Sequence, residues 1–331
     1  GRVNYSFDNK YLLTFNFRRD GSAKFADKQR WGNFPSFSVG WKLHEENFIK
    51  NALPAVSQLK IRGGWGKAGN DLISSYAYLS SINKTNVHYV LGAGQSIVPG
   101  ATITELSSSG IQWEETATTD IGVDLGFAEN KYTASINYFD KATSGILINV
   151  PIPPSLGYGG TFSFGSPVVN EADVRNKGLE FDLGYRNMEG RFNYRINANA
   201  TVNLVKGEVE NLGQGEPIYA AGGQLLRNFT KTAEGLTIGS FYGFRVDKVY
   251  STQAEIDQDP EGYQANAAPG DFRFKDLNND GQITEEDREV IGNPIPDFTY
   301  GISGWFKYGN FDVSISLQGT QGNDIFNQQL Y

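Results

Sequence analysis

The chain has 331 residues, a formal net charge of −8, no cysteine and a single methionine. No apolar run approaches the roughly 18 residues of a membrane-spanning helix, which excludes a helical membrane protein. The acidic balance argues against a nucleic-acid partner, because nucleic acids are bound by basic surfaces. The absence of cysteine excludes a disulfide-stapled scaffold.

Alternating apolar and polar residues predict strands along the chain, since successive side chains of a strand point to opposite faces. After a strand-like start at 2–7, the predicted strands cover residues 11–17, 37–43, 59–65, 121–127, 132–138, 179–185, 191–202, 241–250, 300–307 and 311–318. Short polar turns lie near Asn9, Asn130, Met188 and Gly309. Residues 19–33, 67–113 and 141–177 lack clear alternation and are predicted to be loops.

The hairpin at residues 179–202 shows the alternation most clearly, with one apolar and one polar side on each strand. Both a soluble sheet packed on a core and the wall of a transmembrane barrel show this pattern. The strand at 191–202 exceeds the usual length of about 5–6 residues and is long enough to cross a bilayer at a tilt of about 45°. We therefore favour a barrel and predict that six side chains point outward to lipid: Leu179, Phe181, Leu183, Phe192, Tyr194 and Ile196.

The connections fall into two classes, short turns and long loops, as expected of barrels with short periplasmic turns and long extracellular loops. The abundance of glycine and aromatic residues, with 39 Gly, 22 Phe and 17 Tyr, also suits a barrel with interfacial aromatic bands. If all tight turns lie on one side, an even number of crossings separates each pair. Between Met188 and Gly309 three crossings are predicted, so a further one is expected, and residues 224–232 are the best candidate.

Residues 276–287 match the pattern of a calcium-binding loop, with oxygen ligands at positions one, three and five and glycine at position six. The candidate ligands are Asp276, Asn278, Asp280, Gln282 through its backbone carbonyl, and Asp287. Asp287 stands at position twelve, where glutamate is usual, so it binds with one oxygen or alters the geometry. The alternative is a solvated polar turn. The sequence shows no paired loop of this kind, so we expect a structural Ca²⁺ clip and not a calcium sensor.

No catalytic constellation is found in the sequence. His44 and His88 are the only histidines, and neither glycine-rich segment, at 63–66 or 157–160, has the strand-to-helix context of a phosphate loop. We therefore expect no enzymatic activity and assign no catalytic residue. The long loops carry aromatic side chains suited to stacking on sugars and equally to packing among the loops: Tyr76, Tyr78, Tyr89, Tyr158, Phe162 and Phe164. Substrate-binding residues stay unassigned.

Several blocks resemble the SusC/RagA-type TonB-linked outer-membrane transporters of Bacteroidetes. They are Arg-Arg-Asp-Gly-Ser at 18–22, Trp-Gly-Asn-Phe-Pro-Ser-Phe-Ser-Val-Gly-Trp at 31–41, Leu-Lys-Ile-Arg-Gly-Gly-Trp-Gly at 59–66 with Gly-Asn at 69–70, Asn-Lys-Gly-Leu-Glu at 176–180, and the run from Pro-Gly-Asp at 269–271 to Ile-Gly-Asn-Pro-Ile-Pro-Asp-Phe at 291–298. The blocks span nearly the whole chain in the family order. Two departures are minor: Gly-Trp-Gly at 64–66 replaces the commoner Ser-Tyr-Gly, and Asp287 stands where some members differ.

The resemblance implies that residues 1–331 are one partial barrel domain, all-β and antiparallel, from a barrel of roughly 22 strands with a plugged lumen. The chain opens in a strand-like pattern and stops without an obvious end, so we expect the signal, N-terminal extension, plug and final strands to lie outside it. The resemblance further implies import of oligosaccharides or oligopeptides across the outer membrane. Its implied partners are membrane lipid, a SusD-like surface lipoprotein that lids the barrel, and TonB acting through the plug.

The alternative from a different class is a secreted calcium-binding all-β adhesin or lectin. Such a protein would have shorter strands whose two faces are both partly apolar, as in a sandwich. Strand length, the two classes of connection and the ordered blocks favour the transporter. The two also differ in fractionation, because a barrel needs detergent for extraction and an adhesin does not.

Overall fold

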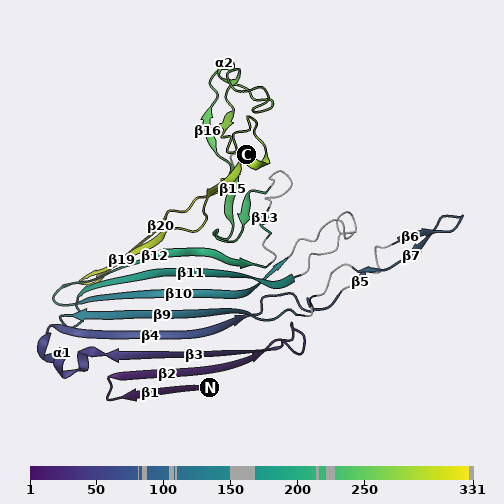
Figure 1. Cartoon of the computed structure of the whole chain (residues 1–331). Helices are drawn as coiled ribbons and strands as arrows, with labels where there is room; N and C mark the ends of the chain where they lie inside the picture. The colour runs from purple at the N-terminus through teal and green to yellow at the C-terminus, as the bar shows by residue number, and fades with distance from the viewer. Residues whose placement is uncertain are drawn as a thin grey trace.

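The fold is dominated by one long antiparallel sheet. The structure, a computed structural model, describes residues 1–80, 82–83, 88–103, 108, 110–149, 168–213, 216–220 and 228–327. Ten strands pair in the order β1-β2-β3-β4-β9-β10-β11-β12-β19-β20, so each strand lies beside its neighbour in the chain or beside the next strand after an excursion (Figure 1). Their bounds are Arg2–Phe7, Tyr11–Gly21, Trp31–Lys42, Val56–Asn70, Glu114–Phe127, Tyr132–Asn149, Val168–Asn187, Phe192–Leu212, Phe298–Tyr308 and Phe311–Gln321.

The register of this sheet places apolar side chains opposite apolar ones on every strand. One row runs from edge to edge through Phe7, Tyr11, Trp41, Ile61, Val123, Ile136, Phe181, Ala200, Tyr300 and Gly319. The adjacent row on the other side runs through Ser6, Leu12, Gly40, Arg62, Gly122, Asn137, Glu180, Thr201, Thr299 and Thr320. A slip of one residue would exchange the two sides, so the alternation fixes the register. We call the two sides the apolar face and the polar face.

The predicted hairpin at 179–202 is confirmed as the facing halves of β11 and β12, where Leu179 lies opposite Val202 and Leu183 opposite Ala198. The prediction of a loop over 141–177 is wrong for much of its length. β10 continues to Asn149 and β11 begins at Val168, while 150–167 lie outside the described residues. The alternation was missed because charged residues such as Asp140 and Lys177 replace the apolar ones on the same face.

The connections at one end of the sheet are short, as predicted. Turns at 8–10, 128–131, 188–191 and 309–310 all lie at the left end in Figure 1. Gly190 and Gly309 have φ values of 81° and 59°, which glycine adopts without steric cost. The β3–β4 connection at this end is longer and carries a 3₁₀ turn, η1 (Leu43–Glu45), and a short helix, α1 (Asn47–Ala52).

Among the residues that the structure describes, two long excursions leave the opposite end of the sheet. Residues 71–113 carry two small hairpins, β5 (Ile82–Asn83) with β8 (Thr102–Ile103) and β6 (His88–Leu91) with β7 (Ser96–Pro99). Residues 213–297 project from the sheet as a separate arm that ends near helix α2 (Gln253–Ile256) (Figure 1). That arm holds a sheet of β13 (Ile218–Ala220), β14 (Thr230–Thr232), β15 (Ser240–Phe244) and β18 (Arg288–Gly292), and a pair of β16 (Val246–Val249) and β17 (Phe272–Phe274).

The prediction of a crossing at 241–250 is wrong, and the extra crossing sought at 224–232 is not needed. Residues 240–249 form β15 and β16, which belong to the two small sheets of the arm. Residues 224–227 lie outside the described part, and 230–232 form β14 of the same arm. β12 and β19 alone separate the turns near Met188 and Gly309, so the number of crossings is even. β15, with five residues, is also too short to span a bilayer, which takes about 9–11 residues.

Candidate functional site

The apolar face of the main sheet is exposed to its surroundings. Leu183 is 59% exposed, and apolar side chains on most of the ten strands are similarly uncovered, including Leu13, Val39, Ile61, Ile121, Ile136, Ile302, Ile315 and Leu317. A soluble monomer rarely exposes a contiguous apolar surface of this extent, whereas a barrel wall presents one to lipid. The six side chains predicted to point to lipid all lie on this face by register. No helix in the described part of the chain is long and apolar enough to cross a membrane.

Aromatic rings gather on the apolar face next to the short turns. Tyr132 and Tyr185 stack with centroids 4.8 Å apart, and Tyr185 lies 5.6 Å from Tyr194. Near the edge strand, Tyr11 stacks on Trp41 at 6.0 Å. Such rings concentrate at the boundary between hydrocarbon and water. The band therefore marks one membrane boundary at the short-turn end.

The polar face carries a hydrogen-bond network that joins β4, β9, β10 and β11. The Arg62 guanidinium donates from Nε to Asp124 Oδ1 at 3.3 Å and from Nη1 to Asn137 Oδ1 at 3.1 Å. The Asn137 amide in turn donates to Glu180 at 3.1 Å, and the Ser135 hydroxyl donates to Asp124 at 2.8 Å. The network was not predicted, because its members come from four separate segments and form no motif.

Gly122 makes room for this network. A Cβ at residue 122 would lie 2.7 Å from Arg62 Cζ and 2.9 Å from Asn137 Oδ1. Only glycine therefore lets the guanidinium lie across the β9 backbone.

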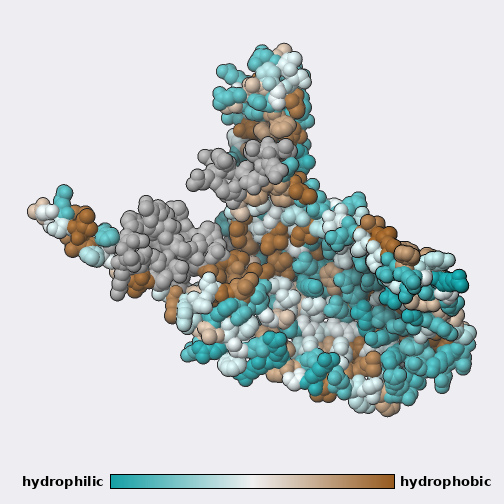
Figure 2. All heavy atoms as spheres, turned by 180° about the vertical axis from the view of Figure 1, so that it is seen from behind, coloured by the Kyte–Doolittle hydropathy of each residue, from teal (hydrophilic) through white to brown (hydrophobic). Residues whose placement is uncertain are grey.

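Figure 2, a view from one side, shows hydrophilic residues spread over a large part of the molecule's broad body. Such a wall can line a water-filled lumen, in which polar solutes exchange hydrogen bonds with the protein.

The character of the two faces inverts at the end of the sheet from which the excursions leave, on β4, β9, β10, β11 and β12. On the former apolar face, Arg175 binds Asp140 through two nitrogens at 2.9 and 2.7 Å, and Lys67 pairs with Glu115 at 2.6 Å. The opposite face carries a buried apolar cluster of Ala172, Val174, Val209 and Leu212, packed against Ile146, Ile148 and Ile218. Charged side chains do not face hydrocarbon without a large cost, so this inversion marks the second membrane boundary.

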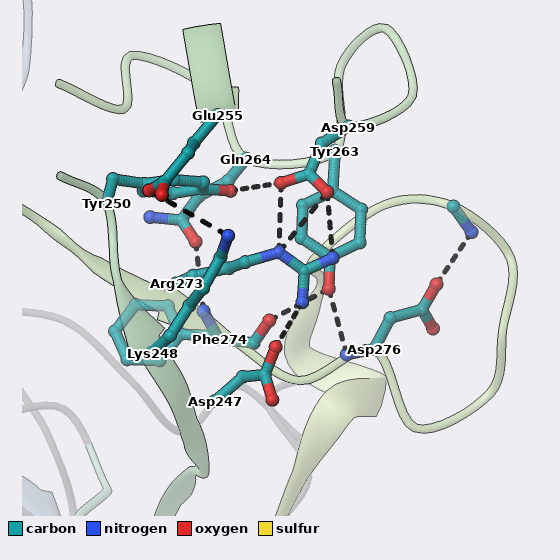
Figure 3. A network of polar contacts seen from close by, with 11 residues as sticks. Asp247, Lys248, Tyr250, Glu255, Asp259, Tyr263, Gln264, Arg273, Phe274 and Asp276 are labelled. Carbon is teal, nitrogen blue, oxygen red and sulfur yellow. Dashed lines mark hydrogen bonds and ion pairs between the residues drawn. The ribbon is translucent and has the colours of Figure 1, made fainter. Parts of the chain in front are cut away.

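The arm at residues 213–297 is held together near its end by the network of Figure 3. Arg273 lies over the Tyr263 ring at 4.5 Å, binds Asp259 through Nε and Nη2 at 2.9 and 2.8 Å, and reaches Asp247 at 2.6 Å. Tyr250, 1% exposed, donates its hydroxyl hydrogen to Asp259. The hydrogen bonds from Arg273 lower the pKa of Asp259. Burial of the Tyr250 hydroxyl and, to a smaller extent, its hydrogen bond to Asp259 raise the pKa of Tyr250 to about 12.

This network also positions the candidate calcium loop. The Tyr263 hydroxyl accepts a hydrogen bond from the Asp276 amide at 3.3 Å, and the Tyr263 carbonyl accepts one from the Ile283 amide at 2.7 Å. Within the loop, the Asp276 carboxylate accepts the amides of Asn279 and Gly281 at 2.6 and 2.9 Å. Gly281 has a φ of 82°, as the sharp turn at position six requires.

The predicted ligands do not all come together. Asp276, Asn278 and Asp280 lie on one turn, and the Asp280 carboxylate accepts the Gln282 amide at 2.8 Å. Asp287 is fully buried and accepts the amides of Leu277 and Thr284, as part of a capping box that opens the 3₁₀ turn η3 (Glu285–Asp287). These backbone hydrogen bonds, above all that of Thr284, lower the pKa of Asp287.

Glu286, which was not predicted, contacts the candidate ligand Asn278. The side-chain nitrogen of Asn278, Nδ2, donates hydrogen bonds to the carboxylates of Asp280 at 3.0 Å and Glu286 at 3.3 Å. Within the residues that the structure describes, no three His, Asp or Glu side chains are grouped so that they could hold a metal ion. The oxygens of Asp276, Asn278 and Asp280 accept backbone amides of the loop itself, and calcium binding by this loop stays a prediction.

The other residues singled out in the sequence do not form a site in the described part of the chain. His44 contacts the Leu59 carbonyl through Nδ1 at 3.1 Å, and His88 lies in the exposed strand β6. Of the aromatic residues considered for substrate stacking, Tyr76 and Tyr89 are exposed in the 71–113 excursion. Tyr158, Phe162 and Phe164 lie outside the described residues.

The geometry matches a known family of barrels. A family model described as "TonB dependent receptor-like, beta-barrel" matches residues 1–328. The chain belongs to the TonB-dependent receptors of the SusC/RagA type. It is 33% identical to TonB-dependent receptor P3 of Formosa agariphila, over 100% of this chain and 32% of the relative. It is 30% identical to TonB-dependent receptor SusC of Bacteroides thetaiotaomicron, over 98% of this chain and 31% of the relative.

Solved structures of this family share the fold. The RagAB peptide importer in its "closed-closed" state superposes with a TM-score of 0.75 at 20% identity, over 97% of this chain and 33% of that chain. The RagAB peptide transporter gives a TM-score of 0.71 at 20% identity, over 96% of this chain and 32% of that one. The chain thus spans about a third of the length of its relatives. Members of this family reside in the outer membrane of Bacteroidetes, so the exposed apolar face is the lipid-facing side of a barrel wall.

The alternative of a secreted adhesin or lectin loses its structural basis. It required two packed sheets of short strands. Ten of the described strands instead form a single sheet with strands of up to 21 residues and an uncovered apolar face.

Proposed function

We propose that this chain is the partial barrel domain of an active importer that carries large nutrients, oligosaccharides or oligopeptides, across the outer membrane. The observation that carries the proposal is the two-faced wall. One face is apolar across all ten strands, and the other carries the polar network around Arg62, suited to a hydrated lumen. Membership of a family of TonB-dependent receptors supports the same function.

The proposed import is energised by TonB, acting on a plug that fills the lumen. A barrel of roughly 22 strands is wide enough to need a plug, and a plugged lumen does not conduct passively. Removal of the inner-membrane energy source in cells should abolish uptake and leave binding of nutrient at the surface intact. Uptake that continued unchanged would contradict the proposal and indicate a passive pore.

The proposed partner at the surface is a SusD-like lipoprotein that lids the barrel. Both long excursions, at 71–113 and 213–297, leave the end of the sheet opposite the short turns and project away from it (Figure 1). They offer a large surface for a partner outside the membrane. Affinity purification of the full-length protein in detergent should recover a lipoprotein in constant ratio, and recovery of the transporter alone would contradict this part of the proposal.

The nutrient is an oligosaccharide or an oligopeptide. RagAB is named as a peptide importer and lies at 20% identity, a level at which its likeness supports the fold and leaves the substrate open. Growth of cells that lack this transporter on defined oligosaccharides and on defined peptides would decide between the two classes. Unimpaired growth on both would contradict the proposed role in nutrient import.

We also propose that the loop at 276–287 binds Ca²⁺ in a structural role. The ligand pattern of Asp276, Asn278 and Asp280 and the turn at Gly281 support the proposal, and Glu286 supplies a further carboxylate beside Asn278. Extracellular loops bind calcium in the range of about 10⁻⁴–10⁻³ M. Calcium should protect residues 270–297 from protease in the full-length protein, and neither chelator-treated protein nor Asp280→Ala should be protected. Equal protease resistance in all three would identify the loop as a polar turn only.

A further inference from the structure

The β3–β4 connection differs from the other turns at its end of the sheet in both length and composition. Residues 43–55 carry η1 and α1, which lie beside the short-turn end of the sheet (Figure 1). On a helix with 100° per residue, Phe48, Ile49 and Ala52 of α1 fall on one side, and the polar residues Asn47, Lys50 and Asn51 fall on the other. The residue that ends the helix, Leu53, is also apolar. The segment is therefore a short amphipathic element.

Glu46, the residue that precedes α1, ties this element to the lipid-facing side of the barrel wall. Its carboxylate accepts hydrogen bonds from the Tyr11 hydroxyl at 2.8 Å and from Trp41 Nε1 at 3.2 Å, and it pairs with Lys10 at 3.2 Å. Tyr11 and Trp41 both belong to the apolar face, in the aromatic band at the membrane boundary. The connection consequently folds toward lipid and away from the lumen.

The apolar side of the element is uncovered in the structure. Phe48 is 60% exposed and Leu53 is 48% exposed, whereas Ile49 is half-buried against the chain. Phe48 follows Glu46 by two residues, so the contacts of Glu46 with Tyr11 and Trp41 place this element at the same end of the sheet as the aromatic band. Lys50 pairs with Glu45 at 2.7 Å on the polar side, where water and lipid headgroups meet.

We propose that residues 46–53 form an interfacial anchor, which lies in the headgroup region of the periplasmic leaflet and inserts Phe48 and Leu53 among phospholipid acyl chains. Amphipathic helices bury their apolar side about 5–10 Å into this boundary. The Glu46 contacts hold the element at the correct depth, because they join it to the aromatic band. The anchor rests on the barrel fold and is independent of the substrate and of the proposed energy source.

Single-cysteine labelling tests the anchor, because these 331 residues contain no cysteine. The full-length protein, with any cysteine elsewhere replaced by serine, would be reconstituted into phosphatidylethanolamine–phosphatidylglycerol vesicles. Spin labels would be placed at Phe48, Leu53, Lys50 and Asn51, with Ile302 as the lipid control and Glu189, in a turn at the same end, as the water control. We expect Phe48 and Leu53 to collide with oxygen as Ile302 does, and Lys50 and Asn51 to collide with a water-soluble nickel chelate as Glu189 does.

Two results would overturn the proposal. Labels at all four positions that behave like Glu189 would show that the element lies in water. Labels at Phe48 and Leu53 that are shielded from both reagents would show that protein, either a second copy or another polypeptide, covers the apolar side.

A pair of variants tests the positioning role of Glu46. Glu46→Ala should abolish the difference in oxygen and nickel-chelate collision between labels at residues 48 and 51. The barrel should stay folded, as judged by its heat-dependent migration in SDS gels. Glu45→Ala is the matched control, because the Glu45 carboxylate pairs with Lys50 and His44 and not with the aromatic band. A contrast that survived Glu46→Ala would refute the positioning role.

Discussion

An arginine on the lipid-facing part of the apolar face should destabilise the barrel, and Leu183→Arg is the most informative case. Leu183 lies between Ala134 and Ala198 in the register, so small neighbours leave its side chain standing out from the sheet. On β11 it lies between the aromatic band at Tyr185 and the first charged residue on this face, Lys177. Leu183 is the first residue inward from the band on this face of β11, so it lies within the hydrocarbon layer, between the band and the midpoint at Phe181.

The expected cost follows from this depth. An arginine on the lipid face costs about 2–4 kcal/mol at the midplane and about 0–1 kcal/mol near the interfaces. Leu183 lies between these two depths, so we expect a cost of about 2 kcal/mol, which lowers the folding equilibrium constant about 30-fold, since about 1.4 kcal/mol is tenfold. Ile196→Arg should cost less, because Ile196 lies directly opposite the band residue Tyr185 and is therefore nearer the membrane boundary than Leu183.

The assay is guanidinium-induced unfolding of the full-length protein in phospholipid vesicles, followed by tryptophan fluorescence. Asp182→Arg is the matched control, because residue 182 neighbours Leu183 in the chain and points to the polar face, opposite Asn199. We expect it to cost less than about 1 kcal/mol, as a substitution in a hydrated lumen should. Equal destabilisation by Leu183→Arg and Asp182→Arg would refute the assignment of the two faces.

Three further predictions concern the polar network and the arm. Gly122→Val should displace the Arg62 guanidinium and cost about 1–3 kcal/mol in the same assay, whereas Gly63→Ala, whose added Cβ meets nothing closer than 3.8 Å, should cost less. The pKa of Asp259 is lower in the folded arm than its ordinary value of 3.8, so the ionised carboxylate stabilises the arm at pH values above 3.8. This stabilisation is lost as the pH falls through the folded-state pKa. Protease should therefore cut the arm faster on acidification, and Asp259→Asn should be cut readily at neutral pH; a wild-type arm indifferent to acid would contradict this. The pKa of Tyr250 is raised from 10 to about 12, so the neutral hydroxyl stabilises the arm at pH values below 10, and this stabilisation is lost as the pH rises toward about 12. Tyr250→Phe should remove this alkaline transition in proteolysis of the arm.

The sequence by itself determined the wall of the barrel within the membrane. The alternation at 179–202 predicted both strands of the central hairpin and the face on which Leu183 and Ile196 lie, because period-two patterning is local and lipid enforces it. The division of the connections into short turns and long loops and the family resemblance also followed from patterns within short segments of the sequence. The calcium motif at 276–287 was also readable, since its spacing lies within one loop, and its occupancy stays a prediction.

Tertiary structure decided what depends on residues far apart in the chain. β10 and β11 extend beyond the membrane as strands although the pattern there inverts, because charged pairs such as Arg175 with Asp140 replace lipid contact. The small sheets of the arm, the Arg62 network and the contact of Glu46 with Tyr11 all join separate segments; Glu46 lies 35 residues from Tyr11, and Arg62 lies 75 residues from Asn137. Alternation specifies which face a side chain occupies, and only the register of the whole sheet specifies which side chains meet there.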